Sequence, residues 1–190
     1  MNVTIKPLTV ELLDDYLYYF DNIAFTDNAH WSGCYCVYYH HDSDNEQWMK
    51  RTKEDNRNYA ITLIKEGKLT GYLAFYDGAP IGWCNVNDKS NYERLLASDE
   101  LWDTKAVKTC SIVCFIVAPE YRGKGIASTI LNKICSDYAE KGYEYIEAYP
   151  VKGDLSNAQQ YHGPFSMYSK AGFTVEKDID RFYVVRKSLK

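Results

Sequence analysis

A short glycine-rich stretch, Arg122-Gly123-Lys124-Gly125, stands where an apolar run gives way to a helical pattern. Residues 109–117 before it are mostly apolar, which predicts a strand buried on both faces. After it, apolar residues recur at helical spacing from Ile126 to Tyr138. The glycines allow a ligand close to the main chain, and the first N–H groups of the helix point into the turn. With its two basic side chains, this turn predicts a cradle for a phosphate or pyrophosphate.

The spacing of the glycines excludes two common nucleotide sites. A P-loop needs a longer glycine loop that ends in Lys-Ser/Thr, and a dinucleotide fingerprint needs three spaced glycines. The order Val-x-Pro-x-x-Arg-Gly-x-Gly-x-Ala, from Val117 to Ala127, instead resembles the acetyl-CoA signature of the GNAT superfamily of N-acetyltransferases. The alternative is an ordinary glycine-rich turn between a strand and a helix. The resemblance implies acetyl-CoA as the co-substrate.

The resemblance also implies which residues hold this cofactor. In the family, acetyl-CoA lies between two splayed strands, and its pantetheine arm pairs with the main chain of the first. Phe115, Ile116 and Val117 would supply those contacts, while the plain alternative is a buried strand. The turn and the start of the helix would hold the pyrophosphate through Arg122, Gly123, Lys124, Gly125, Ile126, Ala127 and Ser128.

The order of predicted elements fits one mixed α/β domain over residues 1–190. The chain is 46% apolar and 25% charged, which is typical of a globular protein. The pattern predicts strands at 3–8, 72–76, 81–86, 105–117, 143–149, 173–175 and 182–185, and helices after Thr9 and at 45–66, 92–96, 124–141 and 164–171. This order is similar to the GNAT fold, a mixed central sheet splayed between its fourth and fifth strands and flanked by helices.

Net charge and cysteine content limit the expected binding partners and cellular compartment of the protein. The net charge of −4 argues against a general nucleic-acid binder. No apolar run approaches the length of a membrane span, and the first residues lack the order of a signal peptide. Three of the six cysteines lie in apolar strand and helix patterns, where cysteine is usually a small buried hydrophobe. We therefore expect a reduced cytoplasmic protein, with a homodimer possible.

A second stretch, Met167-Tyr168-x-Lys170-Ala171-Gly172-Phe173, resembles the short helix and strand start that GNAT enzymes place beside the thioester. The resemblance implies that Tyr168 protonates the departing CoA thiolate, which a phenol can do. The alternative is a helix tyrosine packed on the core. Many family members place an asparagine about one helical segment earlier. In those members the asparagine binds the cofactor arm. Asn157 stands further away than that, so this cofactor-binding role is not extended to Asn157.

The expected acceptor is a primary amine of a small molecule or peptide. Such amines are mostly protonated at neutral pH, so a base or a water chain must remove a proton before attack. Glu147 is the acidic candidate, because a carboxylate in a central strand is buried or in a cleft. The alternative for Glu147 is an ion pair with a nearby lysine or arginine. His162 is another possible base.

The acceptor side is expected in the aromatic segment 31–41, with Trp31, Tyr35 and Cys36 lining the pocket. Aromatic faces and a net negative protein suit a cationic amine. The spacing of Cys34 and Cys36 does not match a usual zinc site, so we expect no metal. The alternative function is a non-catalytic CoA-binding or thiol-sensing module that uses these two cysteines.

Overall fold

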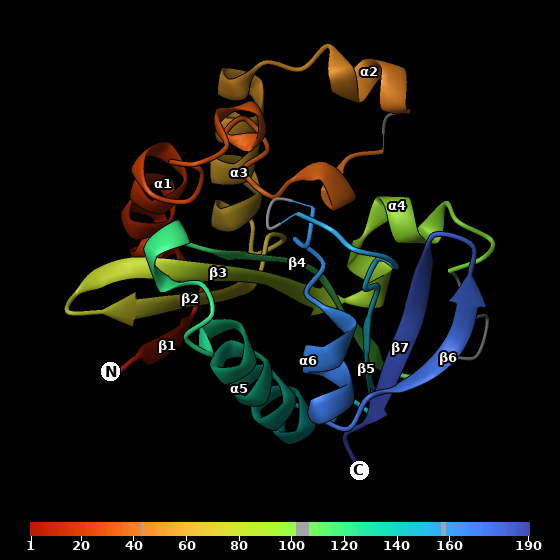
Figure 1. The fold of residues 1–190 in the computed structure, drawn as a ribbon. Coiled ribbons are helices and arrows are strands. Elements are labelled where there is room, and N and C mark those ends of the chain that lie inside the picture. Colours follow the sequence, from red (N-terminus) through yellow and green to blue (C-terminus); the bar gives the residue numbers. More distant parts are fainter. Residues whose placement is uncertain (43, 102–106, 157–158) are drawn as a thin grey trace.

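The computed structural model describes residues 1–42, 44–101, 107–156 and 159–190, and its centre is one twisted sheet (Figure 1). The order of the seven strands across this sheet is β1-β2-β3-β4-β5-β7-β6. Only β4 and β5 run parallel, and every other neighbouring pair is antiparallel. The strands are β1 (Thr4–Pro7), β2 (Gly71–Tyr76), β3 (Ala79–Asp88), β4 (Thr109–Val117), β5 (Tyr145–Ala148), β6 (Thr174–Ile179) and β7 (Phe182–Ser188).

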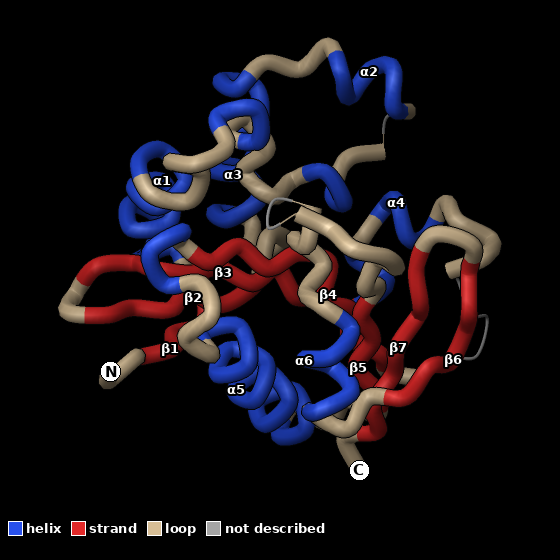
Figure 2. The backbone as a smooth tube through the Cα atoms, in the orientation of Figure 1, coloured by secondary structure: helices blue, strands red, loops and turns tan. Residues whose placement is uncertain are grey.

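Helices cover both faces of the sheet, as the blue segments of Figure 2 show. They are α1 (Leu13–Asn22), α2 (Asn45–Met49), α3 (Lys53–Lys65), α4 (Glu93–Leu96), α5 (Ile126–Glu140) and α6 (Phe165–Lys170). Short 3-10 turns lie at η1 (Val10–Leu12), η2 (Ala29–Trp31), η3 (Tyr38–His40), η4 (Lys89–Asn91) and η5 (Pro119–Tyr121). One core cluster joins α1 and α3 to the sheet, and a second joins α5 and α6 to it. The sheet therefore separates a layer that contains α1 and α3 from a layer that contains α5 and α6.

The sheet opens between β4 and β5. Their paired register ends at Ile112 with Ala148, whereas β4 continues to Val117. The register between β3 and β4 also shifts here, which leaves Val113 as an extra residue on β4. This bulge turns Val113 and Cys114 toward the same core cluster and ends the pairing with β5. The expected mixed sheet, splayed between its fourth and fifth strands, is confirmed.

Several expected boundaries differ from the observed ones. The helix expected over residues 45–66 is two helices, because Thr52 and Asp55 form a capping box that starts α3. β4 begins at Thr109 rather than at 105. Residues 105 and 106 lie outside the described part of the chain. Asn157 also lies outside the described residues. No described helix is both long and apolar enough to cross a membrane.

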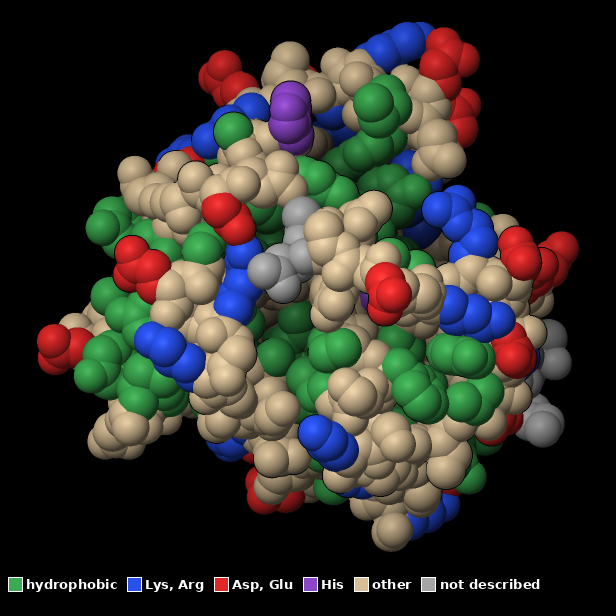
Figure 3. Space-filling view, in the orientation of Figure 1, with side chains coloured by type: hydrophobic (Ala, Val, Ile, Leu, Met, Phe, Trp, Pro, Cys, Tyr) green, Lys and Arg blue, Asp and Glu red, His purple; other side chains and the backbone are tan. Residues whose placement is uncertain are grey.

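The visible surface carries charges of both signs. Figure 3 shows lysine and arginine side chains interspersed with acidic ones on this face, together with scattered apolar groups. No single-sign patch dominates the described part of this face. This pattern agrees with the small net charge of −4.

Candidate active site

The glycine-rich turn forms an open cradle at the start of α5. Gly123 and Gly125 have φ angles of 72° and 80°, a left-handed conformation that favours glycine. Gly125 is the N-cap of α5 and provides no side chain to bind the first N–H groups of the helix. A Cβ atom added at either glycine would meet nothing within 4 Å. The turn therefore leaves room and free donors for an anion, and it fits the pyrophosphate of acetyl-CoA.

The two basic side chains of the turn have different surroundings. Arg122 donates from Nε to the carbonyl of Val117 over 3.0 Å and forms an ion pair with Asp27. The hydrogen bond from Arg122 lowers the pKa of Asp27 below its usual value. The ammonium of Lys124 lies 5.3 Å from the centre of the Tyr121 ring, which is a cation–π contact. Arg122 thus ties the end of β4 to the segment that precedes η2.

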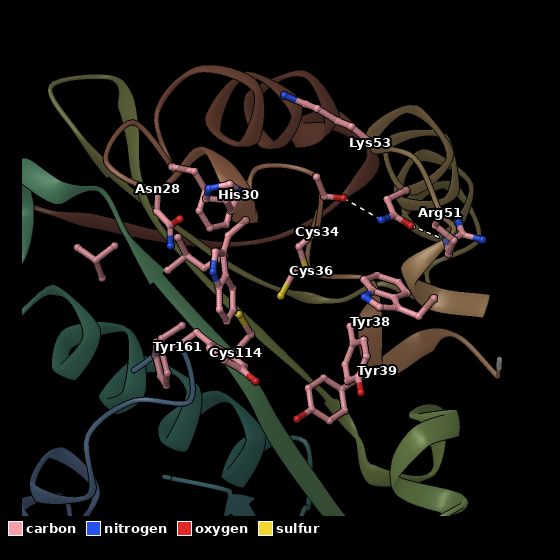
Figure 4. Close-up of a pocket in the computed structure, with 18 of the residues that line it drawn as sticks. Asn28, His30, Cys34, Cys36, Tyr38, Tyr39, Arg51, Lys53, Cys114 and Tyr161 are labelled. Carbon is pink, nitrogen blue, oxygen red and sulfur yellow. Dashed lines mark hydrogen bonds between the residues drawn. The ribbon is translucent and has the colours of Figure 1, made fainter. Parts of the chain in front are cut away.

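A cavity of about 590 Å³ runs from the end of β4 to the aromatic segment (Figure 4). Trp31 and Cys36 line it, beside the strand residues Phe115, Ile116 and Val117. The other side chains in its wall are mainly aromatic, cationic or thiol groups, and the described lining includes no carboxylate. The lining residues are Phe25, Asn28, His30, Trp31, Gly33, Cys34, Cys36, Tyr38, Tyr39, Trp48, Met49, Arg51, Lys53, Asn56, Cys114, Phe115, Ile116, Val117, Arg122 and Tyr161.

Tyr35 does not line this cavity, contrary to expectation. Its ring is buried and stacks on Phe20 with 5.6 Å between ring centres, and its hydroxyl donates to Asp21. Tyr35 and Cys36 both have positive φ angles, of 43° and 53°, which is unusual for residues other than glycine. This conformation turns Tyr35 toward α1 and Cys36 toward the cavity. The sequence carries no regular period here that could have separated the two directions.

Hydrogen bonds hold this strained turn. The Tyr16 hydroxyl donates to the Tyr35 carbonyl over 2.5 Å, and Asn85 Nδ2 donates to the Cys36 carbonyl over 2.9 Å. Burial raises the pKa of Cys34 to about 12. Burial acts on Cys36 in the same direction, but hydrogen bonds with Cys114 and Asn85 bring its pKa below the usual value. The two cysteines of the motif thus differ in their electrostatic surroundings.

The segment that precedes α6 covers the opening between β4 and β5. The Phe115 N–H donates to the Tyr161 carbonyl over 2.5 Å. The Tyr161 ring packs on Trp31, with 5.1 Å between ring centres. One main-chain donor that the resemblance assigns to the pantetheine arm is therefore bound by the chain itself.

Tyr168 lies on the other side of the same opening. It is fully buried, its ring centre is 6.4 Å from that of Phe115, and its hydroxyl donates to the His162 carbonyl over 2.6 Å. Burial raises the pKa of Tyr168 well above its usual value, so the phenol is protonated at neutral pH. The structure thus brings Tyr168 next to β4, with its proton engaged by the segment that covers the opening.

Glu147 is buried in a charge cluster, with 1% of its surface exposed. Lys89 Nζ donates to Glu147 Oε2 over 2.6 Å, and Arg186 donates to Oε1 from Nε over 2.8 Å. Glu147 does not belong to the described lining of the cavity. These contacts favour the ion-pair alternative for Glu147. Lys89 and Arg186 are distant in the sequence, and no local motif indicated that they meet at β5.

The comparisons with known proteins agree with this architecture. The sequence model of the acetyltransferase (GNAT) family matches residues 15–163. The structure is similar to PaiA N-acetyltransferase from Thermoplasma acidophilum in complex with coenzyme A, with 21% identity, 99% of each chain covered and a TM-score of 0.57. It is also similar to an N-acetyltransferase from Staphylococcus aureus Mu50, with 15% identity, 100% of each chain covered and a TM-score of 0.57. No curated protein matches the sequence.

The splayed mixed sheet together with the family match defines an acyltransferase. The chain belongs to the GNAT acetyltransferase family. Its co-substrate is therefore acetyl-CoA, which the open turn at Gly123 and Gly125 fits.

Proposed function

We propose that this protein transfers the acetyl group, or another short acyl group, from its CoA thioester directly to a primary amine. The observation that carries the proposal is the shared cavity, which borders both the free end of β4 and an aromatic wall that includes Trp31 and Trp48. Aromatic faces attract an ammonium group and its apolar body. An amine held on this wall lies beside Phe115, where the resemblance implies the thioester arm.

Acetyl-CoA, when bound, supplies an activated thioester that a neutral amine can attack. The residues of this chain bind and orient it. The N–H groups at the start of α5 are suited to hold the pyrophosphate, because they have no partner within the helix. The main chain of Phe115 and Val117 is suited to orient the arm along β4.

Tyr168 is the proposed proton donor to the CoA thiolate. Its pKa is raised by burial, so its proton is present at neutral pH. The hydroxyl lies next to β4, and its present acceptor is the His162 carbonyl. To protonate a sulfur in the opening, the hydroxyl must exchange this carbonyl for the thiolate. A movement of residues 161–163 that frees Phe115 would also free Tyr168.

A thiol-release assay with acetyl-CoA and a panel of amines tests the proposal. The panel contains 2-phenylethylamine, putrescine, a free amino acid and a short peptide, and mass spectrometry identifies the product. We expect CoA release to depend on an amine and to match formation of its N-acetyl product. Release without an acetylated amine contradicts the proposal.

A second candidate function uses the cysteines. Cys34, Cys36 and Cys114 all line the cavity, and Cys36 shares a hydrogen bond with Cys114. A thiol-sensing module on the same fold could use this cluster without catalysis. Under the proposed transferase function, Cys34→Ser and Cys36→Ser retain CoA binding and turnover, with at most a changed KM for the amine. A folded double variant that binds CoA but has no activity favours the thiol function instead.

A further inference from the structure

The wall of the acceptor cavity carries cations without acidic side chains to balance them. Arg51, Lys53 and Arg122 line the cavity, and the described lining includes no carboxylate. The ammonium of an acceptor amine would add one more positive charge to this wall. An anionic group on the same acceptor would balance it, because opposite charges attract more strongly where little water separates them. The surroundings of each cation decide which of the three is suited to bind such a group.

Two of the three cations are directed elsewhere. Arg122 forms an ion pair with Asp27 beside the glycine cradle. The ammonium of Lys53 lies 5.9 Å from the centre of the Tyr35 ring, which does not belong to the described lining. Figure 4 shows the Lys53 side chain extending away from the centre of the cavity. Of the three, Arg51 is therefore the cation best placed to meet a ligand.

Three neutral groups hold the guanidinium of Arg51 in place. Its Nε donates to Asn56 Oδ1 over 2.5 Å, its Nη1 to His41 Nε2 over 2.9 Å, and its Nη2 to the Asp55 carbonyl over 3.3 Å. The imidazole nitrogen must accept, because a guanidinium only donates. Burial lowers the pKa of His41, which favours its neutral form. These bonds fix the position of the Arg51 charge without compensating it.

Arg51 has no carboxylate partner in the described part of the chain, whereas Arg57 and Arg186 each form an ion pair there. The carboxylate of Asp55 binds the main-chain N–H and the hydroxyl of Thr52 in the capping box. Each terminal nitrogen of a guanidinium carries two N–H groups, and the bonds of Arg51 use one on each. The N–H groups of a guanidinium match the two oxygens of a carboxylate.

Arg51 lies at the opposite end of the cavity from the free end of β4. Figure 4 shows Arg51 on one side of the lining and Cys114 of β4, with Tyr161, on the other. Tyr38 lies between them in this view, and the Trp48 ring packs on it with 5.0 Å between ring centres. The cavity therefore offers the proposed place of transfer at one end, a cation at the other, and aromatic rings between.

We propose that Arg51 binds a carboxylate of the acceptor. The acceptor is then an amino acid in the broad sense, with a primary amine at one end, an aromatic or apolar body, and a carboxylate at the other end. This inference rests on the proposed function and names its substrate class. A single guanidinium matches the single charge of a carboxylate. A diamine such as putrescine places a second cation against Arg51 and is a poor acceptor.

The test compares two acceptors that differ in the anionic group. 4-(2-Aminoethyl)benzoic acid carries a carboxylate on the ring of 2-phenylethylamine and keeps the same aminoethyl arm. We expect kcat/KM of the wild-type protein to be about 10- to 100-fold higher for the acid, the usual contribution of a hydrogen bond between charged groups. The difference should lie mainly in KM. Arg51→Gln should remove this preference and leave kcat/KM for 2-phenylethylamine almost unchanged.

Two further variants separate the carboxylate contact from general charge effects. Arg51→Lys keeps the charge but loses the paired N–H groups, so it should retain part of the preference. Lys50→Gln is the matched control, because it makes the same change in net charge one residue away. Lys50 is exposed, lies outside the described lining, and pairs with Glu46 over 2.7 Å. This control should keep the full preference for the acid.

A binding measurement depends neither on acetyl transfer nor on the folding of a variant. 4-Ethylbenzoate has the ring and the carboxylate but no amine, and 4-ethylbenzamide is its neutral counterpart. Calorimetry with the wild-type protein should give a Kd about 10- to 100-fold lower for the benzoate. In NMR, the benzoate should also shift the Nε–H signal of Arg51. Equal affinities for the two ligands overturn the inference.

The other outcomes separate this inference from the proposed function. Equal kcat/KM for the two acceptors in the wild-type protein, or a preference that survives in Arg51→Gln, shows that Arg51 does not bind the acceptor carboxylate. In either case acetylation of amines by the wild-type protein still stands. If the wild-type protein acetylates no amine of the panel and not the acid, the proposed function fails, and the assignment of the acceptor fails with it.

Discussion

The main-chain N–H of Phe115 and the carbonyl of Tyr161 are joined by a hydrogen bond of 2.5 Å across the opening between β4 and β5. Phe115 lies on the strand edge that we propose for the cofactor arm, and the free protein satisfies this donor with its own chain. Unpaired buried N–H groups are costly, which explains why the opening is covered. Binding of acetyl-CoA along this edge must exchange one partner for another.

This exchange predicts a fluorescence change at Trp31, whose ring packs 5.1 Å from that of Tyr161. When the Tyr161 carbonyl leaves the Phe115 N–H, the Tyr161 ring must move relative to the Trp31 ring. Stopped-flow mixing with acetyl-CoA should therefore change tryptophan emission at a rate that saturates with cofactor concentration. Trp31→Phe should remove the signal and keep the binding. A rate that rises linearly without limit indicates that no such rearrangement precedes tight binding.

The cradle predicts a specific role for Gly125. Gly125→Val places a side chain over the N–H groups of α5 and strains a φ of 80°, at a cost of about 1–3 kcal/mol. Gly67→Val is the matched control, because Gly67 has a φ of 67° and also meets nothing within 4 Å of an added Cβ. Calorimetry should show CoA binding lost in the first variant and kept in the second, with both folded. Normal affinity in Gly125→Val argues against the pyrophosphate site.

Removal of the Tyr168 hydroxyl should lower kcat by about 10²- to 10⁴-fold, the usual contribution of a positioned acid. The Kd of acetyl-CoA should change little, because the proposed role concerns the leaving group. Tyr168→Phe also leaves the His162 carbonyl without its donor, which costs about 1 kcal/mol of stability. If turnover is unchanged while chemistry limits the rate, Tyr168 serves packing alone.

Two buried histidines predict that the fold is less stable in acid. Burial lowers the pKa of His40 and of His162 to about 4, below the usual value of about 6.5. Between these pH values the unfolded chain binds more protons than the folded one, so stability rises with pH. Tm should therefore fall as the pH is lowered from about 7 to about 4.5. His40→Gln should flatten this slope, because it removes one of the two buried imidazoles.

The sequence allowed prediction of the elements that local rules determine. The apolar run of β4, the glycines after it and the helical period of α5 each carry a local signal, and the structure has all three. The apolar pattern of residues 45–66 does not show the break between α2 and α3, although its capping box, Thr52 with Asp55, is readable in the sequence.

The parts of the site that were not predicted depend on contacts between distant residues. Tyr39 and His162 are 123 positions apart, and their meeting depends on how the segment before α6 crosses the sheet. The partners of Glu147 arrive from η4 and β7. The direction of the Tyr35 side chain cannot be inferred from the sequence, because this irregular segment has no period.

A single-turnover experiment with an isotopically labelled acetyl group tests the central claim most directly. Stoichiometric acetyl-CoA, labelled in the acetyl carbons, is mixed with the protein and 2-phenylethylamine, and the label is followed by mass spectrometry. We predict that the label leaves CoA and appears in N-acetyl-2-phenylethylamine at a rate consistent with steady-state turnover. Label that stays on CoA, or that appears only in free acetate, contradicts transfer to an amine in this pocket.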